Sequence, residues 1–383
     1  MRIAILTGGG DVPGLNPCIK AITLGAVRQG WDVVGFRRGW AGPLHYDPAN
    51  PKDSEAQLLR LTRDSVRTID RSGGTMLHSS RTNPAKVKPA DLPDFLKGTL
   101  TPSGGIFDAT PHILKVLEAL KIDALVAIGG DDTLSYAARL HREGVAVMAA
   151  PMTMDNDVFG TDYCMGFSTS VSRSVEMIND LRTPAGSHER IAVIELFGRN
   201  CGETALLSGY LTDADRTLIS EVPFDIGRVA ELLASDRAAN PSRYAVLVLS
   251  EGAQMQEGQI VERGQEDAYG HRKLGGIGEM VGAEITRLTG IGVLNQKLGY
   301  LMRGGPPDAL DQMVAKNYGT MVVQLLAEGK RGLMTAIQGG RYTSVPVDTC
   351  VQGVRRVDVP AFYDTEAYRP RIAQIAAKPM LLY

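Results

Sequence analysis

The chain has 383 residues, of which 44% are hydrophobic, so it can bury a full core and its length predicts two domains. A net charge of −2 gives no electrostatic attraction for nucleic acid or for an anionic membrane surface, and no run approaches the roughly 18 apolar residues of a membrane span. The four cysteines are scattered without a CxxC pair, which indicates neither a zinc site nor a disulfide framework and favours a cytoplasmic protein.

The first 36 residues predict a strand, a glycine-rich loop, a helix and a second strand. Residues 2–7 (RIAILT) form a short apolar run typical of a buried strand, and the loop GGGDVPGLNP follows. Asn16 can cap the next helix, Pro17 suits its first turn, and Gly30 ends it. Residues 31–36 (WDVVGF) then supply the second strand.

The same unit recurs at residues 123–151 and 190–220, and further strands are predicted at 244–250 and 332–338. Strands that alternate with helices predict parallel, doubly wound sheets of the α/β class. No low-complexity linker separates the predicted domains. We therefore expect the chain to pass between the domains more than once.

Two glycine-rich loops are candidate phosphate sites. The glycines at 8–10 let backbone N–H groups approach an anion, although the loop lacks the P-loop lysine and the dinucleotide fingerprint. In GGDDT (129–133), Asp131 can hold Mg²⁺, and Thr133 caps the following helix or donates a hydrogen bond to phosphate. The alternatives are a tight turn for the first loop and an ordinary aspartate cap for the second.

Two further segments carry groups suited to phosphoryl transfer. In TMDND (153–157), a carboxylate could take a proton from an attacking hydroxyl, with Thr153 close by in sequence. Arg190 and Arg199 flank an apolar strand, and their planar guanidinium groups fit phosphate oxygens. The alternatives are a polar turn and solvated surface arginines.

Seven segments together resemble the phosphofructokinase A family, in the same order along the chain: GGGDVPGLN, GGTMLHSSRTNP, GGDDT, PMTMDND, TDYCMGF, SHERIAVIELFGRNCG and LGYLMRGG. The resemblance extends from residue 2 to about residue 338. It implies two similar Rossmann-like α/β domains with mainly parallel doubly wound sheets and an active site between them. It also implies a homodimer or homotetramer that uses Mg²⁺ to transfer a phosphoryl group to O1 of fructose 6-phosphate in glycolysis.

The resemblance also assigns roles to residues that match the family's motifs. Asp155 resembles the base for the sugar hydroxyl with Thr153 beside it, Arg199 the stabiliser of the moving phosphoryl group, and Asp131 the Mg²⁺ ligand. The donor side is implied to include Gly10, Arg81, Asp132 and Thr133. The sugar side is implied to include Phe197, Gly198, Glu221, Tyr300 and Arg303, and also Arg190 contributed across a subunit interface.

Departures from the family's motifs bear on both substrates. Asp132 stands where ATP enzymes have glycine and diphosphate enzymes have aspartate, whereas Met152 replaces the lysine of diphosphate enzymes. Leu294 replaces an arginine of the sugar side, for which Lys297 could substitute, and Met302 replaces a glutamine. We predict diphosphate as the donor, with ATP as the alternative, and a related sugar phosphate stays open as the acceptor.

We expect three regions. Residues 1–160 and about 300–340 bind the donor and Mg²⁺, residues 161–299 bind the sugar phosphate, and residues 341–383 form an extension that packs on a neighbouring subunit. The sequence disfavours two other classes of protein. A ligand-sensing relative without activity has no need of Asp131, Asp155 and Arg199 together, and a Rossmann oxidoreductase would carry the missing fingerprint.

Overall fold

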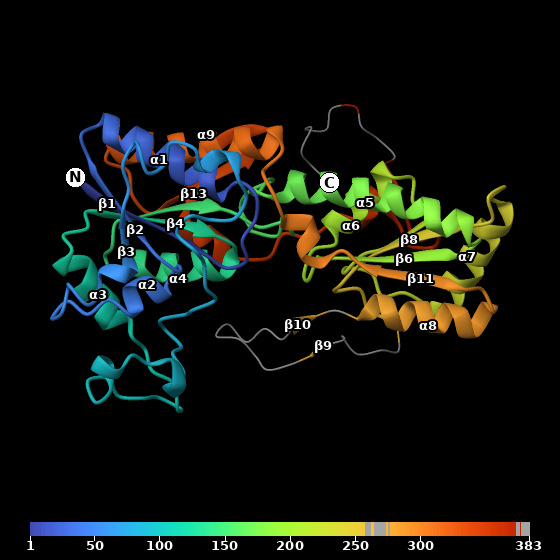
Figure 1. Ribbon diagram of the computed structural model, residues 1–383, viewed down its shortest axis with the longest axis horizontal. Helices are drawn as coiled ribbons and strands as arrows, with labels where there is room; N and C mark the ends of the chain where they lie inside the picture. Colours follow the sequence, from blue (N-terminus) through green and yellow to red (C-terminus); the bar gives the residue numbers. More distant parts are fainter. Residues whose placement is uncertain (257–261, 264–272, 275, 373–375, 377–383) are drawn as a thin grey trace.

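The computed structural model describes residues 1–256, 262–263, 273–274, 276–372 and 376. The chain forms two lobes, each built around a mainly parallel sheet with helices on both faces (Figure 1). The larger sheet has seven strands in the order β13-β12-β5-β4-β1-β2-β3, and the smaller has four in the order β11-β6-β8-β7. The predicted α/β fold with two doubly wound sheets is therefore confirmed.

The strands of the larger sheet are parallel except at its two edges. The parallel strands are β1 (Arg2–Gly8), β2 (Asp32–Phe36), β4 (Ala124–Gly129), β5 (Val147–Pro151) and β12 (Leu333–Gln338). The antiparallel edges are β3 (Leu58–Arg60) and β13 (Arg341–Pro346). The central strands are apolar throughout because both faces of the sheet are covered.

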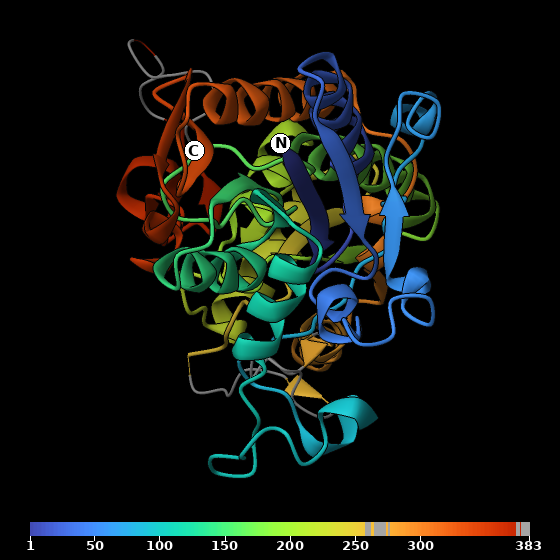
Figure 2. The same cartoon turned by 90° about the vertical axis from the view of Figure 1, so that its left-hand side faces the viewer.

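Helices pack on both faces of this sheet. Helices α1 (Leu15–Arg28) and α9 (Ala309–Ala327) cover one face, and α3 (Thr110–Ala119) and α4 (Asp131–Arg142) cover the other, together with the short α2 (Ala41–Leu44). Figure 2 shows α9 along the top of this lobe and α3 below the strands. The carboxyl ends of the parallel strands are left uncovered by this arrangement.

The smaller sheet is parallel throughout and repeats this architecture. Its strands are β6 (Ile191–Leu196), β7 (Arg216–Leu218), β8 (Ala245–Ser250) and β11 (Val293–Lys297). Helices α5 (Phe167–Ser187) and α6 (Glu203–Leu211) cover one face, and α7 (Ile226–Ala239) and α8 (Ile277–Thr289) cover the other. A separate antiparallel pair consists of β9 (Glu262–Arg263) and β10 (Lys273–Leu274). Among the described helices, none is long and apolar enough to cross a membrane.

The start of α1 differs from our prediction. The helix begins at Leu15 after Gly14, whose φ of 123° favours glycine, and no side chain caps it. Asn16 lies inside the first turn, where its Oδ1 accepts from the Met76 N–H at 2.8 Å and its Nδ2 donates to the Gly73 carbonyl at 3.2 Å. The predicted Asn16 cap is therefore wrong, because this buried amide joins the helix to a distant loop instead.

The chain passes between the lobes more than once, as predicted. It leaves the larger lobe after β5, builds the smaller lobe, and returns to the larger lobe through α9, β12 and β13. Residues 341–346 thus belong to the larger sheet, which corrects the predicted start of the extension at residue 341. The chain then crosses again, and Val357, Phe362 and Tyr368 pack in the core of the smaller lobe, around α10 (Val359–Phe362), β14 (Tyr363–Asp364) and β15 (Arg369–Pro370). The described part of the extension packs on its own chain, and contact with another subunit stays a prediction.

Candidate active site

A cavity of about 1220 Å³ lies between the two lobes. Most of its walls are loops that follow the carboxyl ends of parallel strands: those after β1, β4 and β5 from the larger lobe and those after β6, β8 and β11 from the smaller lobe. This is the position at which open α/β sheets bind ligands. A segment after the antiparallel edge strand β3, which includes Thr75 and residues 78–81, completes the larger lobe's side. The volume exceeds the roughly 300–1,000 Å³ typical of a pocket for one small molecule, so the cavity can hold two substrates side by side.

The carboxylate cluster of this cavity consists of Asp131, Asp155, Asp157 and Glu251. Burial, and next the negative charge of Glu251, raises the pKa of the Asp155 carboxyl to about 7, whereas the backbone N–H and the guanidinium of Arg199 act in the opposite direction. That N–H lies 3.3 Å from Asp155 Oδ2. A carboxyl group with a pKa near neutrality is well suited to exchange a proton with a bound hydroxyl.

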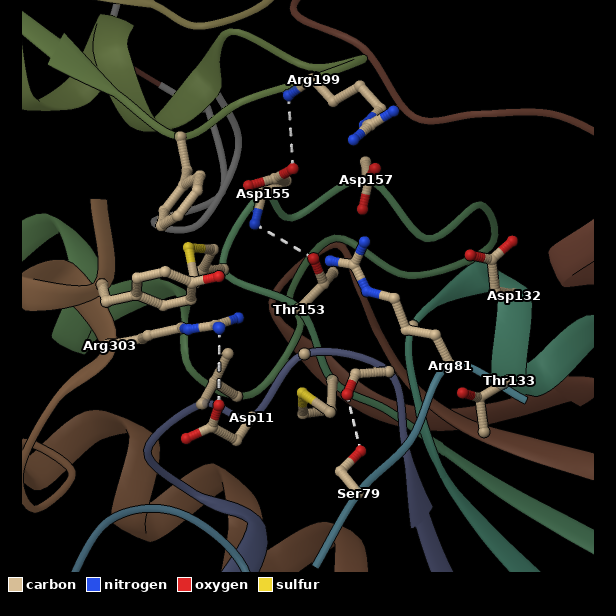
Figure 3. A pocket seen from close by; sticks show the side chains of 18 of the residues that line it. Asp11, Ser79, Arg81, Asp132, Thr133, Thr153, Asp155, Asp157, Arg199 and Arg303 are labelled. Carbon is tan, nitrogen blue, oxygen red and sulfur yellow. Dashed lines mark hydrogen bonds and ion pairs between the residues drawn. The ribbon is translucent and has the colours of Figure 1, made fainter. Parts of the chain in front are cut away.

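Asp157 experiences the negative charges of two other acids of the cluster. Burial, followed by the charges of Asp155 and Asp131, raises the pKa of Asp157 well above its ordinary value. The backbone of the loop that carries Asp155 and Asp157 is held by a hydrogen bond, because the Asp155 N–H donates to Thr153 Oγ1 at 3.1 Å. Figure 3 shows Asp155 and Asp157 between Arg199 on one side and Thr153 and Arg81 on the other.

A divalent cation would relieve this repulsion, and the donor atoms are the oxygens that Mg²⁺ prefers. Within the described ranges, no group of three or more His, Cys, Asp or Glu side chains is arranged to hold a metal ion by itself. Proteins commonly bind Mg²⁺ through one or two carboxylates plus the phosphate oxygens of a substrate. Asp131 and Asp157 fit that kind of shared site.

Cationic side chains line the same cavity. Burial raises the pKa of Glu251, while Lys297, Arg199 and Arg81 oppose that rise in decreasing order, so all three cations lie within electrostatic range of one carboxylate. Lys297 Nζ lies 2.7 Å from Glu195 and 3.8 Å from Glu251. Fixed positive groups around a polar cavity favour anionic ligands such as phosphate esters.

An arginine and two aromatic rings form one end of the cavity. The guanidinium carbon of Arg303 lies 4.5 Å from the centre of the Tyr300 ring and 5.8 Å from that of Phe197. The same guanidinium approaches Asp11 Oδ1 at 3.6 Å. A Cβ on Gly10 would lie 2.5 Å from Arg303 Nη1, so glycine at this position lets the arginine reach the first phosphate loop.

The structure brings most of the predicted site residues together. Those that line the cavity are Gly10, Arg81, Asp131, Asp132, Thr133, Thr153, Asp155, Phe197, Arg199, Tyr300 and Arg303. Thr133 does not cap α4, because it lies inside the helix and its N-cap is Gly130. Its side chain fills the space above two glycines, since a Cβ on Gly8 or Gly129 would lie 2.5 Å from it. The predicted cap is therefore wrong.

Three predicted residues do not line the cavity. Glu221 faces the start of α6, and its carboxylate accepts from the Gly202 N–H at 3.0 Å. The same carboxylate accepts from the N–H of Val357, in the C-terminal segment, at 3.0 Å. Gly198 forms the turn after β6 with a φ of 134°, and its carbonyl accepts from the Ser220 hydroxyl. Arg190 is exposed and directly precedes β6, at the opposite end of the strand from the cavity.

Three acids of the cavity, Asp11, Asp157 and Glu251, have no assigned role in the predicted site. Asp157 follows Asp155 by two residues and points into the same cavity, because Asn156 between them has a left-handed backbone with a φ of 54°. Glu251 directly follows the buried strand β8. An acid immediately after an apolar strand is the same signal that identified Asp131, so Glu251 could have been found from the sequence.

Comparisons with known proteins agree with this geometry. The sequence profile of the family described as Phosphofructokinase matches residues 2–326. A pyrophosphate--fructose 6-phosphate 1-phosphotransferase of Amycolatopsis mediterranei (strain S699) is 38% identical over 372 residues, which cover 96% of this chain and 99% of that protein. An ATP-dependent 6-phosphofructokinase 3 of Streptomyces coelicolor is 34% identical over 368 residues, covering 96% and 99% of the two chains. The solved structure of a pyrophosphate-dependent phosphofructokinase from Nitrosospira multiformis is 15% identical with a TM-score of 0.79, and covers 100% of this chain and 95% of that one, which shows a shared fold.

Proposed function

This chain belongs to the phosphofructokinase family, and we propose that it transfers a phosphoryl group from diphosphate to O1 of fructose 6-phosphate. The observation that carries the proposal is the environment of Asp155. This carboxyl group faces a cavity lined by phosphate-binding cations, and burial together with Glu251 raises its pKa to about 7. It can therefore accept the proton of the O1 hydroxyl as the phosphoryl group is transferred.

The charged groups of the cavity have separate roles in this reaction. Arg199 donates a backbone N–H to Asp155, so its guanidinium lies close to the reacting hydroxyl and can stabilise the moving phosphoryl group. Lys297, Arg303 and Glu251 line the end of the cavity formed by the smaller lobe and its connection to α9, where they are suited to a sugar phosphate. Asp131 and Asp157 would hold Mg²⁺, which when bound neutralises charge on the phosphate oxygens.

Diphosphate is favoured as the donor because of Asp132. Its carboxylate lines the cavity directly beside Asp131 and adds both bulk and negative charge at the loop that would face a nucleotide's α-phosphate. The pyrophosphate enzyme of Amycolatopsis is also more similar to this chain than the ATP enzyme of Streptomyces is. ATP remains the second candidate, since Met152 is buried and supplies no cation for diphosphate.

We also propose that the chain acts as a homodimer or homotetramer. Arg190 is exposed at the end of β6 that faces away from its own cavity, and it could reach the sugar phosphate only in another subunit. The guanidinium would then bind the 6-phosphate, which takes no part in bond breaking. This arrangement would make each acceptor site incomplete in an isolated subunit.

A single assay tests donor and acceptor together. The purified full chain is given fructose 6-phosphate and Mg²⁺ with either diphosphate or ATP, and fructose 1,6-bisphosphate is measured through an aldolase-coupled reaction. We expect product with diphosphate, a higher kcat/KM than with ATP, and loss of activity when EDTA removes the metal. Turnover with ATP alone would overturn the donor assignment, and no product with either donor would overturn the acceptor assignment.

A further inference from the structure

The C-terminal segment reaches the back of the loop that carries Asp155 and Asp157. After β13 the chain runs beside this loop, where Val354 and Val158 form an isolated antiparallel bridge. The Arg355 N–H then donates to the Asp157 carbonyl at 3.0 Å. A segment more than 190 residues away in sequence therefore supports the backbone between the two carboxylates.

The residue between those carboxylates has an unusual conformation. Asn156 has a φ of 54°, a left-handed backbone that non-glycine residues adopt only where their surroundings stabilise it. Its side chain is buried, its Nδ2 donates to Glu203 and to the Asp162 carbonyl at 3.1 Å each, and its Oδ1 accepts from the Cys164 N–H at 2.7 Å. Because Asn156 points into the protein, both of its neighbours can face the cavity.

Arg355 completes the support of Asn156 through a buried ion pair. Its Nη1 donates to the Asn156 carbonyl at 3.0 Å and also to Glu203, and its Nη2 lies 3.2 Å from Glu203 Oε1. The side chains of Arg355 and Glu203 are only 13% and 1% exposed. Glu203 is the first residue of α6 and follows the turn that carries Arg199. The pair thus connects the loop of the proposed base to the loop of the proposed phosphoryl-stabilising arginine.

We infer that Arg355 is a positioning residue for the phosphoryl transfer. Arg355 is not among the residues that line the cavity, but it holds Asn156 in its left-handed conformation and so fixes Asp155 relative to Arg199. The kinetic part of this inference rests on the proposed function. Supporting contacts of this kind matter because a displacement of about 1 Å at a reacting group can cost roughly a hundredfold in rate.

A variant of Arg355 reports on positioning only if the protein stays folded, so its effect on kcat must be separated from its effect on stability. Arg355→Met alone leaves the Glu203 carboxylate buried without its counter-ion, which is strongly destabilising and could prevent folding. The informative protein is therefore the double variant Arg355→Met/Glu203→Gln, which removes both buried charges and leaves an amide oxygen to accept from Asn156. Arg356→Met is the matched control, because Arg356 is the adjacent arginine and is exposed.

We expect the double variant to melt within about 5 °C of the wild type. Its kcat with fructose 6-phosphate and diphosphate should fall by at least about tenfold, while both KM values change by less than about threefold, because bond-making geometry is lost and binding groups are kept. Arg355→Lys, which keeps the charge and a donor, should recover part of kcat. A folded double variant with the kcat of the wild type would overturn the inference.

Hydrogen exchange provides a second measurement that needs no turnover. Peptides that cover residues 152–164 should exchange faster in the double variant than in the wild type and in Arg356→Met, because the Asn156 carbonyl loses its donor. Unchanged exchange in these peptides would overturn the inference whatever the kinetics show. If the wild type has no activity on fructose 6-phosphate, the proposed function fails, and the exchange measurement still decides whether Arg355 holds this loop.

Discussion

At the scale of single residues, burial and neighbouring charges give chemically identical side chains different roles. Asp155 and Asp157 are two residues apart and line the same cavity, but the neighbouring charges that act on their pKa values differ. For Asp155, the N–H and the guanidinium of Arg199 are among the groups that oppose the effect of burial. Asp157 instead experiences mainly burial and the charges of Asp155 and Asp131. This contrast is our reason for proposing proton transfer for Asp155 and metal binding for Asp157.

The first prediction concerns Asp155→Asn. The amide keeps the shape of the carboxyl group but cannot accept the hydroxyl proton, so kcat should fall by about 10²- to 10⁴-fold while the KM for the sugar phosphate stays largely unchanged. Steady-state kinetics measure both constants. Asp64→Asn, on an exposed turn, is the control and should behave as the wild type does. A kcat within about threefold of wild type would remove Asp155 from its role.

The second prediction concerns the donor loop. If Asp132 excludes ATP by bulk and charge, Asp132→Gly should raise the ratio of kcat/KM for ATP to kcat/KM for diphosphate by at least about tenfold, equivalent to about 1.4 kcal/mol. Asp132→Asn keeps the bulk and removes the charge, so it measures how much of the effect is electrostatic. An unchanged ratio in both variants would show that Asp132 does not face the donor.

At the scale of secondary structure, a buried carboxylate joins two helices near the junction of the lobes. Asp311 on α9 is fully buried and accepts from Tyr163 Oη at 2.7 Å and from the N–H groups of Gly166 and Thr169 at 2.8 Å each. It also accepts from the Thr169 hydroxyl at 2.5 Å. These contacts satisfy the free N–H groups at the start of α5, which has no cap from its own preceding residue.

The third prediction follows from these contacts. Asp311→Asn replaces one acceptor oxygen with an NH₂ group that faces donors, so the free energy of unfolding should fall by about 2–4 kcal/mol. Urea denaturation followed by circular dichroism measures this change. Asp180→Asn, on the exposed face of α5, should alter the free energy by less than about 0.5 kcal/mol. A loss below about 1 kcal/mol for Asp311→Asn would show that the helix start is stabilised in another way.

At the scale of the whole molecule, the groups for which we propose a role in the reaction come from both lobes. The larger lobe contributes Asp131, Asp155 and Asp157, and the smaller lobe contributes Arg199 and Glu251. The chain passes between the lobes several times, and the last passage is the segment around Arg355. Several covalent connections therefore join the two lobes that carry these groups. The relative position of the lobes therefore decides whether the proposed base, Asp155, lies close to Arg199.

The fourth prediction addresses the assembly of such molecules. If Arg190 binds the 6-phosphate in another subunit, Arg190→Ala should raise the KM for fructose 6-phosphate by at least about tenfold and lower kcat much less, because that phosphate does not react. Arg243→Ala, at an exposed arginine just before β8 in the same lobe, serves as the control. A loss confined to kcat would contradict a role in ground-state binding, and a strictly monomeric active enzyme would exclude a contribution from another subunit.

The sequence alone predicts the repeated strand, loop and helix units, the two mainly parallel sheets, and the loops of Asp131 and Asp155. These features depend on hydrophobic periodicity and on the conformational needs of glycine-rich turns, which act between residues close together in the chain. Because the carboxyl ends of parallel strands meet at one edge, acids placed directly after such strands also converge. Asp131 and Asp155 could be predicted for this reason.

Only the tertiary structure decided which of the other charged residues reach the cavity. Glu221 supports Gly202 and Val357 instead of a ligand, Lys297 lies between Glu195 and Glu251, and Arg355 reaches Asn156 from the far end of the chain. Each of these placements is set by packing and hydrogen bonding between segments from 19 to 199 residues apart. Local sequence patterns carry no information on such contacts, because the partner of a buried polar group is chosen by the folded shape of the whole chain.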